Sequence, residues 1–225
     1  MSALPPRRAE LQATVTVTEL YRSIQGESTH AGRPCTFVRL AGCPLRCRWC
    51  DTAYSFTGGE KYTVAAIVDQ VVALGVPLVE VTGGEPLAQK QTPALLSALA
   101  EAGFEVLLET SGAFAFAHLD PRVRVIADLK CPGSAEANRN VWPALAGMRP
   151  RDELKIVVAN RVDFDWARDR LASELNTCPA QVLWSPVEGE VAAAELAEWL
   201  LNSGERGRLQ VQLHKLLWPE AARGV

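Results

Sequence analysis

The sequence predicts an α/β fold: a parallel sheet wrapped by helices, in the form of a small, incomplete (β/α) barrel. Two observations predict it. Short apolar segments typical of buried strands alternate with segments of helical spacing, a pattern that indicates parallel strands joined by helices. Polar, glycine-containing motifs follow several of these strands, and α/β sheets and barrels build their sites at that edge. The chain of 225 residues carries about six strand–helix units, fewer than a complete eight-fold barrel.

The composition indicates one globular domain over residues 1–225, with residues 1–12 as a flexible tail. Hydrophobic residues make up 48% and charged residues 22%, which is ordinary for a soluble protein. A formal net charge of −3 provides neither a basic surface for nucleic acids nor a polybasic segment for a membrane. No stretch is typical of a signal peptide or a membrane span. We therefore expect a cytoplasmic protein whose 6 cysteines are metal ligands or small buried residues.

The first third of the chain predicts two strands that lead into a cysteine-containing loop. Residues 14–20 alternate strictly and are rich in β-branched residues, so we expect a strand with one buried face. A polar turn with a glycine follows at 23–28, and a second strand at 36–42 delivers the chain into the loop. Beyond the loop, the spacing of apolar residues predicts a helix at 64–74.

The rest of the chain predicts strands and helices in alternation. The helix expected at 92–102 has Thr92 as its N-cap, Pro93 in its first turn and Gly103 as its stop. Short apolar segments predict further strands, at 77–81, 104–109, 124–129, 153–158, 180–184 and 209–213. Helical spacing predicts further helices at 164–175 and 192–201, and residues 214–219 are expected to form a tail.

The loop after the second strand carries Cys43, Cys47 and Cys50, followed by Asp51 and Thr52. This spacing is too tight for separate disulfides, but it lets the three sulfurs converge on one metal centre. A structural zinc site normally has four protein ligands, and an iron–sulfur cluster commonly has four cysteines. Because no fourth ligand lies nearby, the loop favours a cluster with one iron open to an exogenous ligand. Zinc and reduced structural thiols are the alternatives.

The cysteine loop and a second motif resemble the radical S-adenosylmethionine (SAM) superfamily. Cys43, Cys47 and Cys50 match its C-x3-C-x2-C hallmark, in which the thiolates hold a [4Fe–4S] cluster and SAM chelates the fourth iron. Thr-Gly-Gly-Glu-Pro at 82–86 matches the superfamily feature at which backbone and Glu85 meet the methionyl part of SAM. The resemblance implies a radical-SAM-type (β/α)6-like partial barrel with the cluster loop after an early strand. It also implies reductive cleavage of SAM to a 5′-deoxyadenosyl radical.

A narrower resemblance, to the 7-carboxy-7-deazaguanine synthase family, covers nearly the whole chain. It rests on the segments at 23–28, 37–43, 50–52, 128–134 and 212–219. The resemblance implies a carbon–nitrogen lyase that converts 6-carboxy-5,6,7,8-tetrahydropterin to 7-carboxy-7-deazaguanine and ammonia by radical ring contraction, in 7-deazapurine (queuosine-type) biosynthesis. SAM acts catalytically and Mg2+ is required. A homodimer and an external one-electron reductant, such as flavodoxin or ferredoxin, are implied as well.

The resemblance also implies roles for individual residues. Arg39 suits a substrate carboxylate because a guanidinium can bind it through two parallel bonds; a structural ion pair is the alternative. Thr52 offers Mg2+ the hard oxygen ligand it prefers; a helix N-cap is the alternative. The full set of implied substrate contacts is Ile24, Gln25, Gly26, Glu27, Arg39, Thr82 and His214. The implied SAM contacts are Trp49, Cys50, Asp51, Gly84, Glu85, Ser111, Asp128, Leu129 and Lys130.

Two other functions fit parts of the sequence. A radical SAM activase, which makes a glycyl radical on a partner enzyme, shares the cysteine loop and the turn at 82–86 but has no need of Arg39. A non-catalytic zinc-binding module would use Cys35 or His30 as its fourth ligand. The sequence leaves open whether the product enters a tRNA base or a secondary metabolite. It also leaves open whether the C-terminus, which extends to Val225, contacts the substrate.

Overall fold

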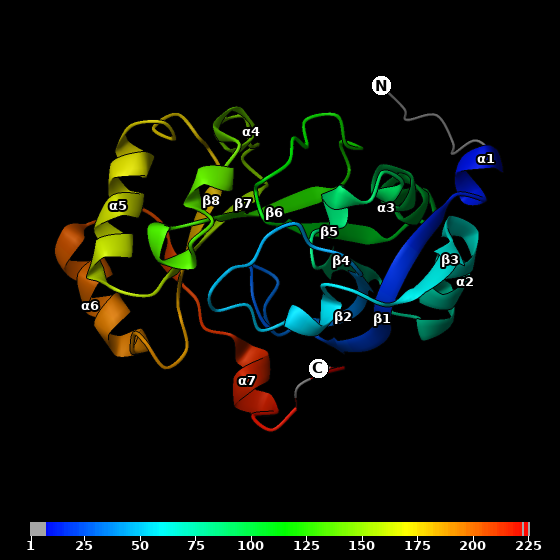
Figure 1. The fold of residues 1–225 in the computed structure, drawn as a ribbon, viewed down its shortest axis with the longest axis horizontal. Helices are drawn as coiled ribbons and strands as arrows, with labels where there is room; N and C mark the ends of the chain where they lie inside the picture. Colours follow the sequence, from blue (N-terminus) through cyan, green and yellow to red (C-terminus); the bar gives the residue numbers. More distant parts are fainter. Residues whose placement is uncertain (1–7, 222, 225) are drawn as a thin grey trace.

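The structure is a computed structural model that describes residues 8–221 and 223–224 (Figure 1). One 9-stranded sheet runs through it in the order β3-β1-β2-β4-β5-β6-β7-β8-β9. Its strands are β1 Thr14–Ile24, β2 Pro34–Leu40, β3 Glu60–Thr63, β4 Leu78–Gly83, β5 Glu105–Thr110, β6 Arg124–Leu129, β7 Glu153–Val158, β8 Gln181–Pro186 and β9 Arg208–Leu209. The helices are α1 Arg8–Leu11, α2 Val64–Leu74, α3 Thr92–Glu101, α4 Trp142–Ala146, α5 Arg161–Ala172, α6 Ala193–Ser203 and α7 Leu213–Leu217.

The sheet is open, which confirms the incomplete barrel. In the order of the sheet, all neighbouring strands from β2 to β4 and on to β9 are parallel. Strand β1 pairs antiparallel with both β2 and β3. The sequence did not predict this antiparallel edge. It forms because the connection between β1 and β2 is too short to hold a crossover helix. Figure 1 shows α5 and α6 at one end of the sheet and α2 and α3 at the other.

Alternation along each strand gives the sheet two different faces. The outer face and its helices form the main core, to which β4 contributes Val79 and Val81 and β5 contributes Val106 and Leu108. The inner face carries a smaller apolar cluster of Cys35, Phe37, Leu78, Leu107 and Ile126, with Tyr21 packed against it. Because successive side chains point to opposite faces, the next inward positions beyond this cluster lie toward the carboxyl ends of the strands, where they are available for a site.

Local sequence signals placed helix α2 correctly but not the start of helix α3. Helix α2 has the predicted bounds: the Thr63 hydroxyl caps it by accepting from Ala66 N (3.1 Å), and Gly75 ends it in the left-handed region with φ 67°. Helix α3 differs at its start. Gln91 holds the N-cap position, and the Thr92 hydroxyl instead donates to the carbonyl of Pro86. The prediction of Thr92 as the cap was wrong because its hydroxyl bonds to the turn that precedes the helix.

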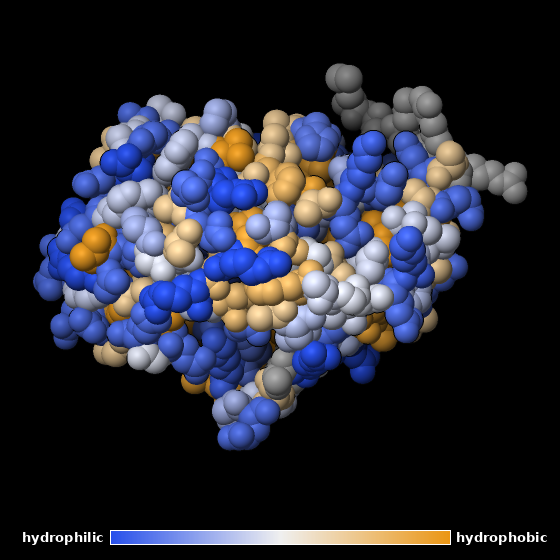
Figure 2. Space-filling model, in the orientation of Figure 1, coloured by the Kyte–Doolittle hydropathy of each residue, from blue (hydrophilic) through white to orange (hydrophobic). Residues whose placement is uncertain are grey.

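The two ends of the chain also differ from expectation. Residues 8–11 of the predicted tail form α1, since Leu11 packs against the main core; residues 1–7 lie outside the described residues. Of the strand predicted at 209–213, only Leu209 pairs with β8, together with Arg208 before it, and the chain then turns into α7 over part of the predicted tail. The surface in Figure 2 is largely hydrophilic around its outline, with apolar residues gathered near the centre of the face shown. Within the described residues, no helix has the length and apolar character needed to cross a membrane.

Candidate active site

A cavity of about 760 Å3 opens at the carboxyl ends of the parallel strands. Its walls come from the cysteine loop, the ends of β2 and β4 through β8, the turn after β1, and α7. A volume of this size is in the range of cavities that enclose small-molecule ligands. Nearly all the side chains implied by the resemblance line it: Ile24, Gln25, Gly26, Glu27, Arg39, Cys43, Cys47, Trp49, Cys50, Asp51, Thr52, Thr82, Gly84, Ser111, Asp128, Lys130 and His214.

The three cysteines of the loop are free, partly buried, and all on the cavity wall. Backbone bonds hold the loop in place: Gly42 N donates to Ser55 O (2.7 Å) and Arg48 N donates to Ser134 O (3.1 Å). Burial raises the pKa of the Cys43 thiol and, against the opposing charge of Lys130, that of Cys47. Thiols converging from one loop on one cavity match the donor set of an iron–sulfur cluster.

The geometry gives no support to a zinc module. Cys35 and His30, its candidate fourth ligands, lie at the opposite edge of the sheet from the cysteine loop. Cys35 is buried near the start of β2, and His30 Nε2 lies 2.9 Å from Oε1 of Glu105, the first residue of β5.

The glycines after β4 let two backbones pack closely. A Cβ on Gly84 would lie 2.4 Å from the carbonyl oxygen of Gly42 and 2.9 Å from the Cβ of Cys43. Glu85 N donates to the same Gly42 oxygen at 2.8 Å, so the end of β4 is the direct support of the cysteine loop. The sequence motif therefore has a packing reason here beyond any approach to a cofactor.

Two implied SAM contacts do not line the cavity. Glu85 is completely buried, and its carboxylate accepts from Leu87 N (2.8 Å), Thr110 Oγ1 (2.9 Å) and Ser111 N (2.7 Å). Its side chain thus joins the turn after β4 to the end of β5. The ammonium group of SAM, expected as its partner, would have to compete with these donors. Leu129 faces the outer core because strand alternation directs Asp128 and Lys130, its neighbours, into the cavity.

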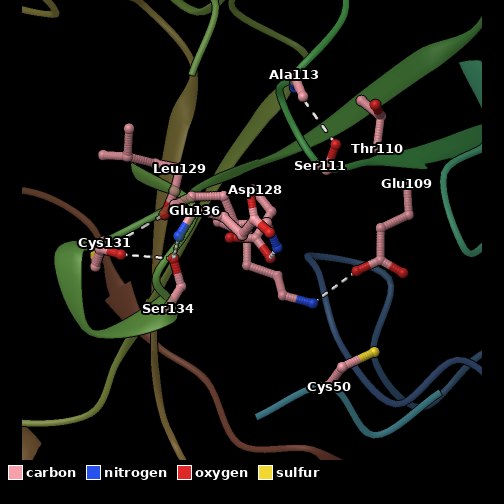
Figure 3. A network of polar contacts seen from close by, with 12 residues as sticks. Cys50, Glu109, Thr110, Ser111, Ala113, Asp128, Leu129, Cys131, Ser134 and Glu136 are labelled. Carbon is pink, nitrogen blue, oxygen red and sulfur yellow. Dashed lines mark hydrogen bonds and ion pairs between the residues drawn. The ribbon is translucent and has the colours of Figure 1, made fainter. Parts of the chain in front are cut away.

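Asp128 has a feature that points to a ligand. Its Oδ2 accepts from Lys130 Nζ at 2.7 Å, whereas its Oδ1 is buried without a hydrogen-bond partner. Burial lowers the pKa of Lys130, but the charge and hydrogen bond of Asp128, together with Cys47, raise it overall, so the amine stays charged. A buried carboxylate oxygen needs a donor, and a ribose hydroxyl or an ammonium group supplies one. Figure 3 shows Asp128 and Glu109 facing the same space as the Cys50 thiol.

The part of the cavity beneath the turn at 25–28 is a network of buried charges. Lys155 Nζ lies 2.6 Å from both Glu27 Oε2 and Glu109 Oε1. Burial lowers the pKa of Lys155, but Glu109 and Glu27 outweigh it and raise it. Burial, together with the charges of Glu109 and Glu27, raises the pKa of Glu80 well above its ordinary value.

Gln25 connects this network to the turn. Its Oε1 accepts from Glu27 N at 2.7 Å, which fixes the amide so that Nε2 donates to Glu80. Glu80, Glu109 and Lys155 were missed by sequence analysis. The available signal was a charged residue within each otherwise apolar strand, as with Glu80 in Leu-Val-Glu-Val at 78–81.

Arg39 and Thr52 occupy positions that suit ligands. Arg39 Nε donates to Glu19 (3.0 Å) and its Nη2 to the Tyr21 hydroxyl (3.0 Å), so an ion pair exists and orients the guanidinium at the cavity. Thr52 does precede a short 3-10 helix, but its side chain makes no capping bond. The hydroxyl lies on the cavity wall 3.8 Å from Cys50 Sγ.

The comparisons agree with this site. The sequence profile of the Radical SAM superfamily matches residues 38–132, which include the cysteine loop and the turn after β4. The fold is similar to that of QueE from Escherichia coli, with a TM-score of 0.75 at 23% identity, covering 89% of this chain and 95% of that one. It is also similar to SuiB from Streptococcus suis, with a TM-score of 0.56 at 12% identity, covering 82% and 50%. Fold and site define a radical SAM enzyme.

Sequence relatives narrow the class. The chain is 44% identical over 217 residues to the 7-carboxy-7-deazaguanine synthase of Chlorobaculum tepidum, covering 95% of this chain and 99% of that protein. It is 38% identical over 224 residues to the 7-carboxy-7-deazaguanine synthase of Koribacter versatilis, covering 93% and 99%. The chain therefore belongs to the 7-carboxy-7-deazaguanine synthase family.

Proposed function

We propose that this chain, as a single radical SAM domain, converts 6-carboxy-5,6,7,8-tetrahydropterin to 7-carboxy-7-deazaguanine and ammonia. One observation carries the proposal: the C-x3-C-x2-C loop and a buried, polar substrate pocket open into the same cavity. A cavity closed beneath by the Lys155 network suits a small polar heterocycle, whereas an activase must admit a segment of a protein. The reaction is balanced without an added oxidant, because substrate and product differ by one ammonia.

The cofactor half of the site lies along the cysteine loop. Cys43, Cys47 and Cys50 would hold the [4Fe–4S] cluster, and the unpartnered Asp128 Oδ1 would accept a hydrogen bond from SAM. Cluster and SAM together supply a 5′-deoxyadenosyl radical. Further SAM contacts come from Trp49, Asp51, Gly84, Ser111 and Lys130. An external one-electron reductant of the flavodoxin or ferredoxin kind would reduce the cluster.

The substrate half lies beneath the turn at 25–28. Arg39 binds the substrate carboxylate, and Gln25 and Glu27 present acceptors and donors to the ring edges, with Ile24, Gly26, Thr82 and His214 around them. Thr52 would offer its hydroxyl oxygen to Mg2+, which prefers hard oxygen ligands and usually keeps several waters. We further propose a homodimer that acts in the cytoplasm and in queuosine-type biosynthesis.

An anaerobic turnover assay tests the proposal. The protein, reconstituted with iron and sulfide, is supplied with reductant, SAM, Mg2+ and 6-carboxytetrahydropterin, and 7-carboxy-7-deazaguanine is measured by mass spectrometry. We expect product far in excess of consumed SAM, and no SAM cleavage after Cys47→Ala. Omitting Mg2+ tests the metal separately. Cleavage of SAM without product would reject the substrate and return the activase as the better function.

A further inference from the structure

The two halves of the cavity come from chain segments that are far apart in the sequence. The substrate turn, residues 25–28, follows β1, and the end of the cluster loop, residues 50–52, follows β2. Proper hydrogen transfer requires the substrate and the radical source to lie at a fixed separation, because reacting atoms must approach to about 3–3.5 Å. The segment 210–215, which runs from the end of β9 into the first turn of α7, contacts both halves.

Gln212 makes the connecting contacts. Its side-chain nitrogen donates to Glu27 Oε1 at 2.7 Å and to Asp51 Oδ2 at 3.3 Å. One amide group, with its two N–H donors, thus joins the substrate turn to the residue that follows the last cluster cysteine. Gln212 is half-buried and lines the cavity. Since Glu27 and Asp51 are both carboxylates, the neutral donor between them also separates two like charges.

The rest of the segment is fixed mainly to the substrate turn. Leu213 N donates to Gly26 O at 2.9 Å, and the side chain of Gln210 accepts from Ser28 N at 2.9 Å. Contact with the cluster loop is sparser: besides Gln212, Lys215 Nζ lies 4.0 Å from Asp51 Oδ2. Lys215 is also paired with the exposed Glu188 at 2.8 Å. Gln212 is therefore the hydrogen-bonded link from this segment to the cluster loop.

We propose that Gln212 is a positioning residue, which fastens the substrate turn to the cluster loop and so sets the separation across which hydrogen is transferred. The inference rests on the proposed function, but it concerns a residue that none of the implied contacts includes. Gln212 acts through Glu27 and Asp51 and is not itself a ligand of substrate or SAM.

Two substitutions and a matched control test this. Gln212→Leu removes both bonds while keeping similar bulk, and Gln212→Glu places a third carboxylate beside Glu27 and Asp51. Glu188→Gln serves as the control, because it removes an exposed ion pair of the same segment and leaves Gln212 in place. All proteins are loaded with cluster and SAM and assayed with 6-carboxytetrahydropterin, with 5′-deoxyadenosine and deazapurine product both measured.

We expect product formed per 5′-deoxyadenosine to fall by about tenfold in Gln212→Leu and further in Gln212→Glu, since a misplacement of about 1 Å costs about 10²-fold in rate. Glu188→Gln should keep the ratio of the unsubstituted protein. A Gln212→Leu variant with an unchanged ratio overturns the inference. So does a proportional loss of both compounds with a lowered unfolding midpoint, which would indicate a role in folding only. No product from the unsubstituted protein would instead reject the proposed reaction.

Hydrogen exchange on the protein without cluster or SAM gives a readout independent of turnover. If Gln212 joins the two halves, Gln212→Leu should accelerate amide exchange in peptides covering both 25–28 and 50–52. Glu188→Gln should leave the peptide at 25–28 unchanged. Faster exchange confined to 210–217 in Gln212→Leu would contradict the link, whatever the activity assay shows.

Discussion

Gly84→Ala is the substitution for which the structure gives the firmest expectation. The added Cβ would lie 2.4 Å from Gly42 O, 2.7 Å from Gly42 C and 2.9 Å from Cys43 Cβ. Ordinary contact begins at 3.4 Å, so the cysteine loop must move away from β4 by about 1 Å. The φ of Gly84 is not in the left-handed region, which makes the effect purely steric.

The magnitude follows from two contributions. Overpacking against a backbone costs about 1–3 kcal/mol. The displacement also stretches the bond from Glu85 N to Gly42 O, now 2.8 Å, which is worth about 1 kcal/mol. We expect the free energy of unfolding to fall by about 2–4 kcal/mol. The moved atoms belong to the residue before Cys43 and to Cys43 itself. The iron content after reconstitution should therefore fall by a larger fraction than the free energy of unfolding.

Urea unfolding and iron analysis measure the two effects. Gly147→Ala is a suitable control: Gly147 also has an ordinary φ, its nearest atom would be Pro143 O at 3.1 Å, and it lies outside the cavity lining. The control should retain iron and lose less stability. A change of less than about 0.5 kcal/mol in the free energy of unfolding is typical of harmless surface substitutions. If Gly84→Ala shows a change this small and binds iron normally, β4 does not support the cysteine loop in the way described.

Three further predictions use other contacts. Gly26→Ala would place a Cβ 2.6 Å from His214 Nδ1, so it should weaken substrate binding, seen as a raised KM, with SAM cleavage retained; an unchanged KM would refute the contact. Glu80→Gln keeps an acceptor for Gln25, and because burial raises the pKa of Glu80, the variant should gain stability over the parent as pH rises above about 4.3, the unfolded value, with no difference below it. Glu80→Leu leaves the side-chain nitrogen of Gln25 without its acceptor. It should lower the free energy of unfolding, measured in urea at neutral pH, by about 1–3 kcal/mol. The hydrogen bond from Arg33 lowers the pKa of Glu105 to about 2, so Glu105→Gln should be modestly destabilising above about pH 4.3, and the deficit should shrink as pH falls toward that lower pKa; a deficit that persists at pH 2 would contradict the ion pair.

Prediction from the sequence succeeded where the information is local. Helix α2 could be placed to the residue because its cap, its apolar spacing and its terminal glycine all lie within the segment. Strands β6 and β7 also have the predicted bounds. It failed where a partner outside the segment decides. The Thr92 hydroxyl donates to the carbonyl of Pro86, in the turn before the helix, and of residues 209–213 only Leu209 pairs with a neighbouring strand.

The candidate site shows the same division. By itself the sequence determined the chemistry of the cysteine loop, because the spacing of Cys43, Cys47 and Cys50 is a property of a few consecutive residues. Only the tertiary structure decided that Glu80, Lys155 and Gln212 line the same cavity as that loop. Their proximity depends on strand pairing and on the inward direction of alternate side chains, which bring residues from separate strands to one edge of the sheet. The sequence therefore identified the reactive centre, and the fold determined what surrounds it.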